Sequence, residues 1–403
     1  MKRIVKRLVF IISLLLFLYF WTKKSQQNDF KSFNFSSVIY PSPYDDKTTL
    51  IRYFEKTQQL IIDEEKVSIA KNHKIVIANS RSIPDSRFLL LEYTKIFGQE
   101  KFCSKSSLDI FSKQCPYQNC DYTCNHSRLN EAQLVLFHKY DVKKEQMPTK
   151  RNIDQVWLLW HDEPLFLVSH DFNQYLFNWT TSYIFNSEIS FGAYGLTLLR
   201  NDNTDIDFEQ WINEQYEKRL NQASWFVTNC GAKRRLDYYY RLRQYFPIIV
   251  HGTCVDKQNF SSCPRFSSCE TDQLKSTKFY LAFESQTCKD YITEKFWRAL
   301  KYGTIPIALG PLMKQSYERI APPNSFIYVG DYETPQLLAQ HLYEIVKNKN
   351  IFRKYHLWRK YYWTGYSAQD NEQYRFCEVC YKLNTVNSHI YYTNIHEFFS
   401  DQC

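Results

Sequence analysis

The sequence predicts an α/β protein with two doubly wound parallel sheets, and three observations lead to this class. Short apolar runs recur along the chain, each bounded by polar or turn residues. Continuous apolar runs of this length suit strands that are buried on both faces, as in a parallel sheet. Helix-like segments separate several of the runs. The length of 403 residues is enough for two globular units, because a domain commonly takes roughly 100 to 200 residues.

The first element is an uninterrupted apolar stretch at residues 8–21, which follows four basic residues in 1–7. The stretch is shorter than the roughly 20 residues of an ideal spanning helix, but the bulky residues at 19–22 do not suit cleavage of a signal peptide. We therefore expect a signal-anchor transmembrane helix at 8–21, with 1–7 as a cytoplasmic tail and the rest of the chain in the lumen. Residues 22–70 are mostly polar and are typical of a stem.

Buried strands are expected at seven apolar runs after the stem, namely residues 74–78, 133–137, 156–160, 224–228, 247–250, 279–283 and 305–309. Helices are expected at 235–246 and 291–302, because each of these segments separates two of the runs. We place a first α/β unit at 71–220, a second at 221–365, and a cysteine-bearing C-terminal segment at 366–403.

The net charge of +9 suits an anionic partner such as nucleic acid, a membrane surface or the phosphates of a nucleotide sugar. The positive charges are scattered, and no dense basic stripe is present beyond residues 2–7 and 233–235. A nucleic-acid partner is therefore not expected. With 9 glycines and neither a GxGxxG nor a P-loop pattern, the chain is not expected to bind a dinucleotide cofactor either.

The 12 cysteines, an even number, suit disulfide bonds in an oxidising lumen. Cys377 and Cys380 could form half of a zinc site, but no second pair of ligands follows at zinc spacing. We therefore expect disulfides at these positions and no bound metal. Acceptor sites for N-linked glycans are expected at Asn34, Asn125, Asn178 and Asn259.

Residues 278–310 combine a buried strand, an acid–base cluster, an amphipathic segment and a second buried strand. In doubly wound sheets, ligands bind beyond the carboxyl ends of the strands, which places Glu284 at the edge of a ligand site. Tyr291, Glu294 and Lys295 are spaced for one helix face, where Lys295 could meet a diphosphate. On spacing alone, Glu294 and Lys295 fit a solvated surface at least as well.

The stretch FYLAFESQTCKDYITEKFWRALKYGTIPIALG resembles the signature of the α1,3/α1,4-fucosyltransferases, glycosyltransferase family 10. Residues 177–195, 228–239, 251–254 and 375–383 are similar to further blocks of that family. The resemblance implies two Rossmann-like domains that face a cleft in a GT-B arrangement, the first for the acceptor and the second for the donor. It also implies an inverting transfer from GDP-fucose, with no cofactor required.

In that family an Arg and a Lys hold the donor phosphates, and the resemblance assigns these roles to Arg235 and Lys295. It places four more residues near the nucleotide or the fucose, namely Tyr280, Glu284, Tyr291 and Glu294. Fixed cations in a dry site can stabilise the negative charge that gathers on the departing GDP. No Asp-x-Asp pattern that would demand a metal follows a strand, because residues 205–207 lie in a polar linker.

The acceptor hydroxyl needs a base, and the family uses a carboxylate that precedes a Pro after an apolar strand. The residues Trp-His-Asp-Glu-Pro at 160–164 stand in that place. An ungapped match puts Asp162 at the carboxylate, and a one-residue deletion puts Glu163 there. We favour Glu163 because its longer side chain reaches an acceptor more easily. His161 is a weaker candidate, and the acidic pair could instead cap a turn.

Together these features predict transfer of L-fucose to the 3-OH of N-acetylglucosamine in a glycoprotein glycan, by a single-pass type II protein of the Golgi membrane. Three residues depart from the family pattern: Ser285 replaces an Asn, Ala193 a Pro and Lys233 a Ser. Three alternatives remain open at this stage. They are a catalytically silent glycan-binding relative, a transferase for another nucleotide sugar, and a protein O-fucosyltransferase.

Overall fold

The computed structural model describes residues 74–77, 81, 83, 86–111, 115–152, 154–164, 168–190, 193–199, 207–254, 263–264, 267–365 and 368–400. The predicted anchor at 8–21 and stem at 22–70 lie outside these residues, as do Asn34 and Asn259. Within the described ranges, no helix combines the length and the apolar character needed to cross a bilayer.

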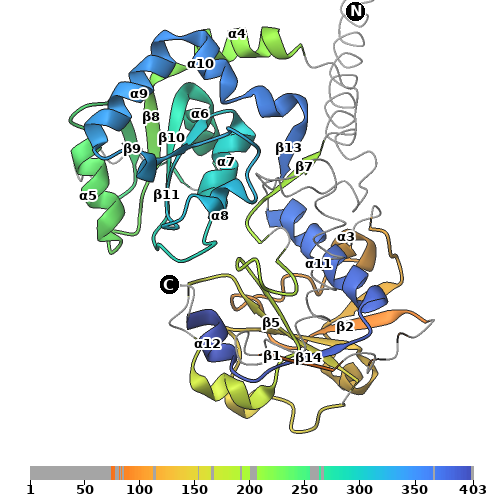
Figure 1. Ribbon diagram of the computed structural model, residues 1–403. Coiled ribbons are helices and arrows are strands. Elements are labelled where there is room, and N and C mark those ends of the chain that lie inside the picture. Colours follow the sequence, from red (N-terminus) through yellow and green to blue (C-terminus); the bar gives the residue numbers. More distant parts are fainter. Residues whose placement is uncertain are drawn as a thin grey trace, which may run out of the picture.

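The first unit is built on a five-stranded parallel sheet with the order β3-β2-β4-β5-β6. Two of these strands, β2 and β5, are labelled in Figure 1. Its strands are β2 (Phe88–Glu92), β3 (Cys120–Thr123), β4 (Leu134–His138), β5 (Val156–His161) and β6 (Trp179–Ser182). Every residue of β2, β4 and β5 is buried, as continuous apolar runs predict. The predicted strands at 133–137 and 156–160 are therefore confirmed.

The second unit contains another five-stranded parallel sheet, with the order β12-β11-β10-β8-β9. Its strands are β8 (Leu220–Phe226), β9 (Ile248–His251), β10 (Thr277–Phe283), β11 (Ile305–Leu309) and β12 (Ile327–Tyr328). Helix α5 (Lys233–Leu242) connects β8 to β9, and α7 (Glu294–Tyr302) connects β10 to β11. The four strands and two helices predicted here are confirmed, with shifts at their ends, and both units have the predicted parallel α/β fold.

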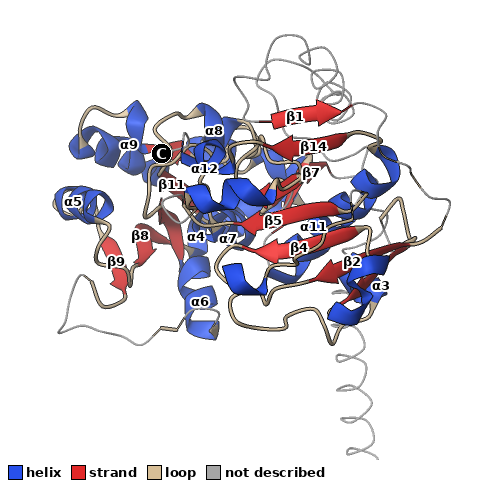
Figure 2. Cartoon of the chain, turned by 90° about the horizontal axis from the view of Figure 1, so that it is seen from below, coloured by secondary structure: helices blue, strands red, loops and turns tan. Residues whose placement is uncertain are grey.

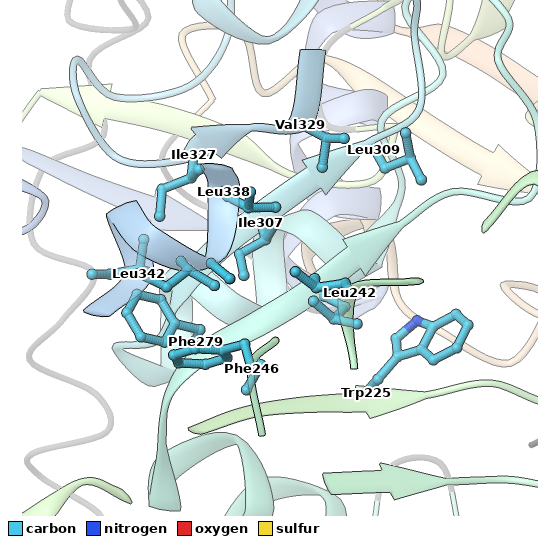
Figure 3. Close-up of a cluster of buried hydrophobic side chains, with 14 of the residues drawn as sticks. Trp225, Leu242, Phe246, Phe279, Ile307, Leu309, Ile327, Val329, Leu338 and Leu342 are labelled. Atoms are coloured by element: carbon cyan, nitrogen blue, oxygen red, sulfur yellow. The ribbon is translucent and has the colours of Figure 1, made fainter. Parts of the chain in front are cut away.

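The core of the second unit lies between its sheet and the helices α5 and α9 (Pro335–Lys347) (Figure 3). Trp225, Phe279 and Ile307 project from three neighbouring strands, while Leu242 and Leu338 come from the two helices. All five side chains are fully buried. This packing fixes β8 and β10, whose carboxyl ends carry the candidate donor residues.

The remaining helices are α3 (Ser107–Phe111), α4 (Phe208–Lys218), α6 (Ser268–Ser276), α8 (Gln315–Glu318), α10 (Lys349–Lys354), α11 (Ala368–Thr385) and α12 (Ile395–Ser400). Short 3₁₀ helices are η3 (His126–Glu131), η4 (Lys144–Gln146), η5 (His170–Tyr175), η6 (Val329–Asp331) and η7 (Leu357–Lys360).

Two short antiparallel sheets complete the described part of the fold. Strand β1 (Lys74–Ile77) pairs with β14 (His389–Tyr392), and the two lie side by side in Figure 2. Strand β7 (Leu196–Leu199) pairs with β13 (Tyr362–Gly365). The run at 74–78 is thus a strand, but its expected place in a parallel sheet is wrong. Its partner comes from the opposite end of the chain, which a local apolar pattern cannot reveal.

The expected boundary between the units at residue 220 also needs correction. Helix α4 packs on the second unit, where Phe208 and Ile212 join the core and Glu209 pairs with Arg353 at 2.6 Å. Residues 208–220 therefore pack with the second unit. The helix precedes its first strand, so the apolar runs alone placed the boundary too late.

After β13, the C-terminal segment returns to the first unit (Figure 1). Helix α11 packs against α3, and disulfides join Cys377 to Cys115 and Cys380 to Cys120. Cys377 and Cys380 therefore form disulfides, as predicted. Three further disulfides are Cys103–Cys124, Cys230–Cys254 and Cys263–Cys269.

The two described sequon asparagines differ sharply in exposure. Asn125 is exposed at the start of η3 and stays a predicted glycan site. Asn178 is fully buried, and its amide nitrogen donates to the carbonyl oxygen of Ile390 at 2.8 Å. Its amide oxygen accepts from the backbone nitrogen of Trp157. A glycan on Asn178 is incompatible with this packing, so that prediction is wrong.

Candidate active site

Asp162 and Glu163 follow the carboxyl end of β5 but have different surroundings. The Asp162 carboxylate accepts two hydrogen bonds from Arg375, at 2.8 and 3.1 Å, and one from the indole nitrogen of Trp160 at 2.6 Å. Both members of the Asp162–Arg375 pair are buried. Asp162 therefore ties α11 to the first sheet, and both of its oxygens are occupied.

Glu163 is only partly buried and reaches across to the second unit. The Tyr291 hydroxyl donates to Glu163 Oε2 at 3.2 Å. The rings of Tyr183 and Tyr194 pack against the ring of Tyr291, with centroids 5.0 and 6.1 Å away. An aromatic cluster from both units thus packs around the tyrosine that donates to this carboxylate.

Tyr291 lies in the turn before α7, and not on the helix as the sequence predicted. The helix begins at Glu294. Asp290 has a positive φ of 62°, which turns the chain just before Tyr291. Its carboxylate accepts from the backbone nitrogen of Phe185 at 3.3 Å and from the Ser316 hydroxyl at 3.0 Å. The turn directs Tyr291 toward the first unit, away from the helix face that it was expected to share.

The beginning of α7 is held by Glu284, the first residue after β10. Glu284 is buried and accepts from the backbone nitrogen of Thr293 at 2.8 Å and from its hydroxyl at 2.8 and 3.0 Å. Lys295 Nζ lies 3.2 Å from Glu284 and 3.3 Å from Glu294. The structure therefore brings these three predicted donor residues together at a helix N-terminus.

Arg235 lies in the first turn of α5 and is buried. Its guanidinium donates to the carbonyl oxygens of Phe283, at the end of β10, and Asn229. Within the described part of the chain, its Nε has no hydrogen-bond partner. Arg235 thus lies beside the carboxyl end of β10 and keeps one buried N–H without a protein acceptor.

Tyr280 does not take the predicted position near a donor. It points from β10 toward α7, is fully buried, and receives a hydrogen bond from Arg298, which also pairs with Glu270. Side chains alternate along a strand, so Tyr280 and Glu284 share one face, but only Glu284 lies beyond the sheet. A direct contact between Tyr280 and a ligand is incompatible with this burial.

Charge and burial shift the pKa values of the residues that meet here. Burial raises the pKa of Glu163, and the negative charges of Asp162 and Glu294 add to that effect. The hydrogen bond from Tyr291 and the charge of Lys295 act in the opposite direction. Burial alone would lower the pKa of Lys295, but the carboxylates of Glu284 and Glu294 outweigh it and raise the value. Lys295 therefore stays cationic.

Sequence reasoning missed Arg375 and Thr293. Arg375 meets Asp162 across 213 residues of chain, so no local spacing could reveal the pair. The hydroxyl of Thr293 bridges Glu284 and Lys295, which it meets at 2.7 Å. Thr293 lies inside the helix predicted at 291–302, and it was a usable signal for a later start, because Thr favours the N-cap position.

Among the described residues, one group has the spacing of a metal site, namely Glu92, Cys103 and Cys124. The two cysteines form a disulfide with each other, so they cannot act as thiolate ligands. Asp207, from the linker that holds the Asp-x-Asp sequence, caps α4 by accepting from the backbone nitrogen of Gln210 at 2.8 Å.

The site therefore lies where the carboxyl end of β5 in one parallel α/β unit faces that of β10 in another. A helix N-terminus with a fixed cation on one side suits an anionic ligand. A carboxylate with a raised pKa on the other side suits proton transfer. Fold and site together define the class of two-unit α/β proteins that bind an anionic ligand where the sheet edges meet.

Comparison with known protein families makes the class specific. The model for glycosyltransferase family 10 (fucosyltransferase), C-terminal part, matches residues 216–398, and the fucosyltransferase N-terminal model matches residues 85–195. The 3-galactosyl-N-acetylglucosaminide 4-alpha-L-fucosyltransferase of Homo sapiens is 31% identical over 66% of this chain and 71% of its own length. This chain belongs to glycosyltransferase family 10, the fucosyltransferases, and the resemblance noted in its sequence is confirmed.

Other relatives agree with this assignment. The alpha-(1,3)-fucosyltransferase fut-6 of Caenorhabditis elegans is 29% identical over 79% of this chain and 83% of its own length. Glycoprotein 3-alpha-L-fucosyltransferase A of Drosophila melanogaster is 29% identical over 73% of this chain, which spans 57% of the fly protein. A crystal structure of an alpha1,3-fucosyltransferase with GDP-fucose is 18% identical over 68% of this chain and 82% of that one, with a TM-score of 0.43. The chain is a glycosyltransferase of the fucosyltransferase family.

Proposed function

We propose that this protein moves L-fucose from GDP-β-L-fucose to the 3-OH of N-acetylglucosamine in a glycoprotein glycan, with inversion at C1 of fucose. The observation that carries the proposal is the hydrogen bond between Tyr291 of the second unit and Glu163 of the first. It brings a partly exposed carboxylate to the same place as the cation at the start of α7. The base that would act on the acceptor and the cation that would bind the donor then lie in one site.

In the proposed reaction, Glu163 removes the proton of the acceptor hydroxyl as the hydroxyl oxygen attacks C1 of fucose. The new bond from oxygen to C1 forms on the face opposite the nucleotide. The bond from C1 to the β-phosphate oxygen breaks, and GDP leaves with the electron pair. The raised pKa of Glu163 suits a general base, because a carboxylate of ordinary pKa holds a proton too weakly. Asp162 is not assigned this role, since Arg375 occupies its oxygens.

We assign the diphosphate of the donor to Lys295 and Arg235. Lys295 Nζ retains some exposure at the N-terminus of α7, where an anion is also favoured by the helix dipole. The buried Nε of Arg235 lacks a protein acceptor, and a phosphate oxygen would supply one. Glu284 holds Lys295 and the start of α7 in place, and Glu294 lies within 3.3 Å of the same ammonium.

We also propose that the chain is a type II protein of the Golgi membrane, anchored by residues 8–21. Two observations support a lumenal catalytic part. No cysteine of the described chain is free, which is typical of an oxidising compartment. The relatives from fly and human are named for glycoprotein and N-acetylglucosaminide acceptors.

The direct test is incubation of the full chain with labelled GDP-fucose and a panel of glycans, glycopeptides and unglycosylated peptides. We expect label on N-acetylglucosamine, with NMR of the product showing an α1,3 linkage. Label on a peptide Ser or Thr would replace the proposal with protein O-fucosylation.

A thermal-shift panel of nucleotides tests the donor independently. A nucleotide at a hundred times its dissociation constant adds about 2.7 kcal/mol to the free energy of unfolding. We expect GDP to raise the melting temperature and UDP to leave it unchanged. Protection by GDP without turnover on any acceptor would indicate a catalytically silent relative, and protection by UDP would indicate another donor.

A further inference from the structure

The Cys103–Cys124 disulfide lies in the wall of a cavity of about 780 Å³ in the first unit. It joins the segment after β2 to the residue that follows β3. Both cysteines are partly exposed, whereas the four cysteines that tie α11 to the first unit are buried. A small thiol can therefore reach Cys103–Cys124 through the cavity, and access is one of the factors that set the rate of thiol–disulfide exchange.

A buried carboxyl group lies beside this disulfide. Glu92 is the last residue of β2, and its Oε1 lies 3.8 Å from Cys103 Sγ. A carboxylate oxygen of Glu92 and the two sulfurs lie within 4.8 Å of one another, and no other group of described His, Cys, Asp and Glu side chains is arranged in this way. The second oxygen, Oε2, accepts a hydrogen bond from the Tyr122 hydroxyl at 2.5 Å. Oε1 is therefore the oxygen from which a proton can pass to the sulfur.

The surroundings of Glu92 favour its protonated form. Burial raises the pKa of Glu92 to about 7, and the negative charges of Glu100 and Asp141 add to that effect. The hydrogen bond from Tyr122 and the charge of Lys101 act in the opposite direction. A carboxyl group with such a pKa can donate a proton near neutral pH, where an ordinary carboxyl group is already ionised. The other titratable side chains in the cavity wall are Tyr93, Lys95, His126, Tyr140 and Lys143.

We propose that Cys103–Cys124 is a thiol–disulfide exchange site that a small dithiol opens, with Glu92 as the proton donor to the departing sulfur. In the first step, one thiolate of the dithiol attacks Cys124 Sγ and forms a mixed disulfide. The bond between the two protein sulfurs breaks, and its electron pair passes to Cys103 Sγ. That sulfur takes the proton of Glu92 and becomes a thiol.

In the second step, the other thiol of the dithiol loses its proton to solvent and attacks the reagent's own sulfur in the mixed disulfide. Cys124 then leaves as a thiolate and is protonated by solvent, which also returns a proton to Glu92. The protein disulfide is thereby reduced to two thiols, and the dithiol is oxidised to a cyclic disulfide.

Reduction loosens the cavity wall without removing the sheet beneath it. Strands β2 and β3 stay paired from Phe88 to Leu91, and the backbone nitrogen of Gly98 still donates to Asp141 at 2.8 Å. The segment between β2 and Cys103 loses its covalent tie to the end of β3. The exchange therefore acts on one wall of the cavity, while the buried disulfides continue to hold the C-terminal segment.

The first test treats the full chain with dithiothreitol, stops the reaction with acid at intervals, and alkylates the thiols of the unfolded chain. Mass spectrometry then measures the rate at which each disulfide opens. We expect Cys103–Cys124 to open about 10-fold faster or more than Cys230–Cys254, because general acid catalysis contributes at least this much. Cys230–Cys254 is the matched comparison, since Cys230 is exposed but the pair does not share its place with a carboxylate as Cys103–Cys124 does. Equal rates would overturn the proposal.

The pH dependence separates proton donation from access. Dividing the rate by the concentration of dithiothreitol thiolate removes the titration of the reagent itself. In the unmodified chain, this corrected rate should be highest below about pH 7 and should fall as Glu92 loses its proton above that pH. In Glu92→Gln, it should be about 10-fold lower below pH 7 and independent of pH. Glu145→Gln, at an exposed acid of the same unit, should keep the rate and its fall.

Tyr122→Phe provides a second variant, with a melting curve to check the folding of each protein. The Tyr122 hydroxyl donates to Glu92 and lowers its pKa, so without it the corrected rate should begin to fall at a higher pH. Disulfide opening that is slower by one factor at every pH would indicate a structural effect and would contradict the proposal. A fall in the corrected rate that persists unchanged in Glu92→Gln would also overturn it.

Discussion

Two neighbouring carboxylates follow β5, and the structure gives them different roles that the sequence could not distinguish. Asp162 and Glu163 are adjacent and chemically alike, and both precede Pro164. Packing gives Asp162 a buried guanidinium partner and leaves Glu163 facing the second unit. The distinction depends on Arg375, which lies far along the chain. The sequence alone therefore could not decide which of the two carboxylates is the base.

Glu163→Gln should lower kcat by about 10² to 10⁴, because loss of a general base typically costs this much. GDP binding should remain, since the residue belongs to the acceptor side. Steady-state kinetics and GDP titration would check both. Asp162→Asn is the matched control and should act on stability, because breaking a buried ion pair costs about 3 to 5 kcal/mol. A large loss of kcat only in Asp162→Asn would reverse the assignment.

Tyr291→Phe should move the acid limb of the kcat–pH profile upward. The Tyr291 hydroxyl donates to Glu163 and thereby lowers its pKa, while burial raises it. Without the hydrogen bond, the pKa of Glu163 rises, so the carboxylate that acts as the base forms only at a higher pH. A purely structural role would reduce kcat by the same factor at all pH values, and the limb would not move.

At the scale of elements, continuous apolar runs predicted the strands that lie inside the two parallel sheets. Apolar runs did not reveal β3 and β6, because the sequences of these strands, CDYT and WTTS, are mostly polar. Strand β2, FLLLE, carries the same apolar signal as its neighbours, but no strand was predicted at 88–92, so this one was missed. The start of α7 was misplaced because Glu284, outside the helix, binds its first turn.

The approach of β7 to α7 depends on Gly195. A Cβ at this position would lie 2.1 Å from the ring of Trp297, which is itself buried. Gly195→Ala should therefore displace α7 and cost about 1 to 3 kcal/mol of unfolding free energy, as overpacking typically does. Thermal or urea unfolding would measure this. Gly231→Ala is the control, since its nearest contact would be 3.3 Å from a flexible Asn229 side chain, and an equal loss there would contradict the argument.

At the scale of the whole molecule, the chain leaves the first unit, builds the second, and returns to close the first. Cysteine number and compartment predicted disulfides, but the pairing of Cys115 with Cys377 could not be read from spacing. The same return path places Arg375 beside Asp162. Long-range closure of this kind has no local signature, which is why the unit boundaries were only partly predictable.

Removal of both the Cys115–Cys377 and the Cys120–Cys380 disulfides by Cys→Ser changes should lower the unfolding free energy by about 2 to 5 kcal/mol. The two bonds span 262 and 260 residues and close nearly the same loop, so both must be removed to release the unfolded chain. Removal of Cys263–Cys269, which spans 6 residues, should cost less. Urea unfolding of the two variants would compare them, and a larger loss for the short loop would contradict this account.

The central claim is that the donor diphosphate lies at the start of α7 and is held there by Lys295. Calorimetric titration of GDP into the full chain and its Lys295→Met variant tests it most directly. Met keeps the apolar stem and removes the charge, so the dissociation constant should rise at least 10-fold, which corresponds to about 1.4 kcal/mol. Lys218→Met, at an exposed lysine of α4, should bind GDP as the unmodified chain does. An unchanged dissociation constant in Lys295→Met would contradict the account.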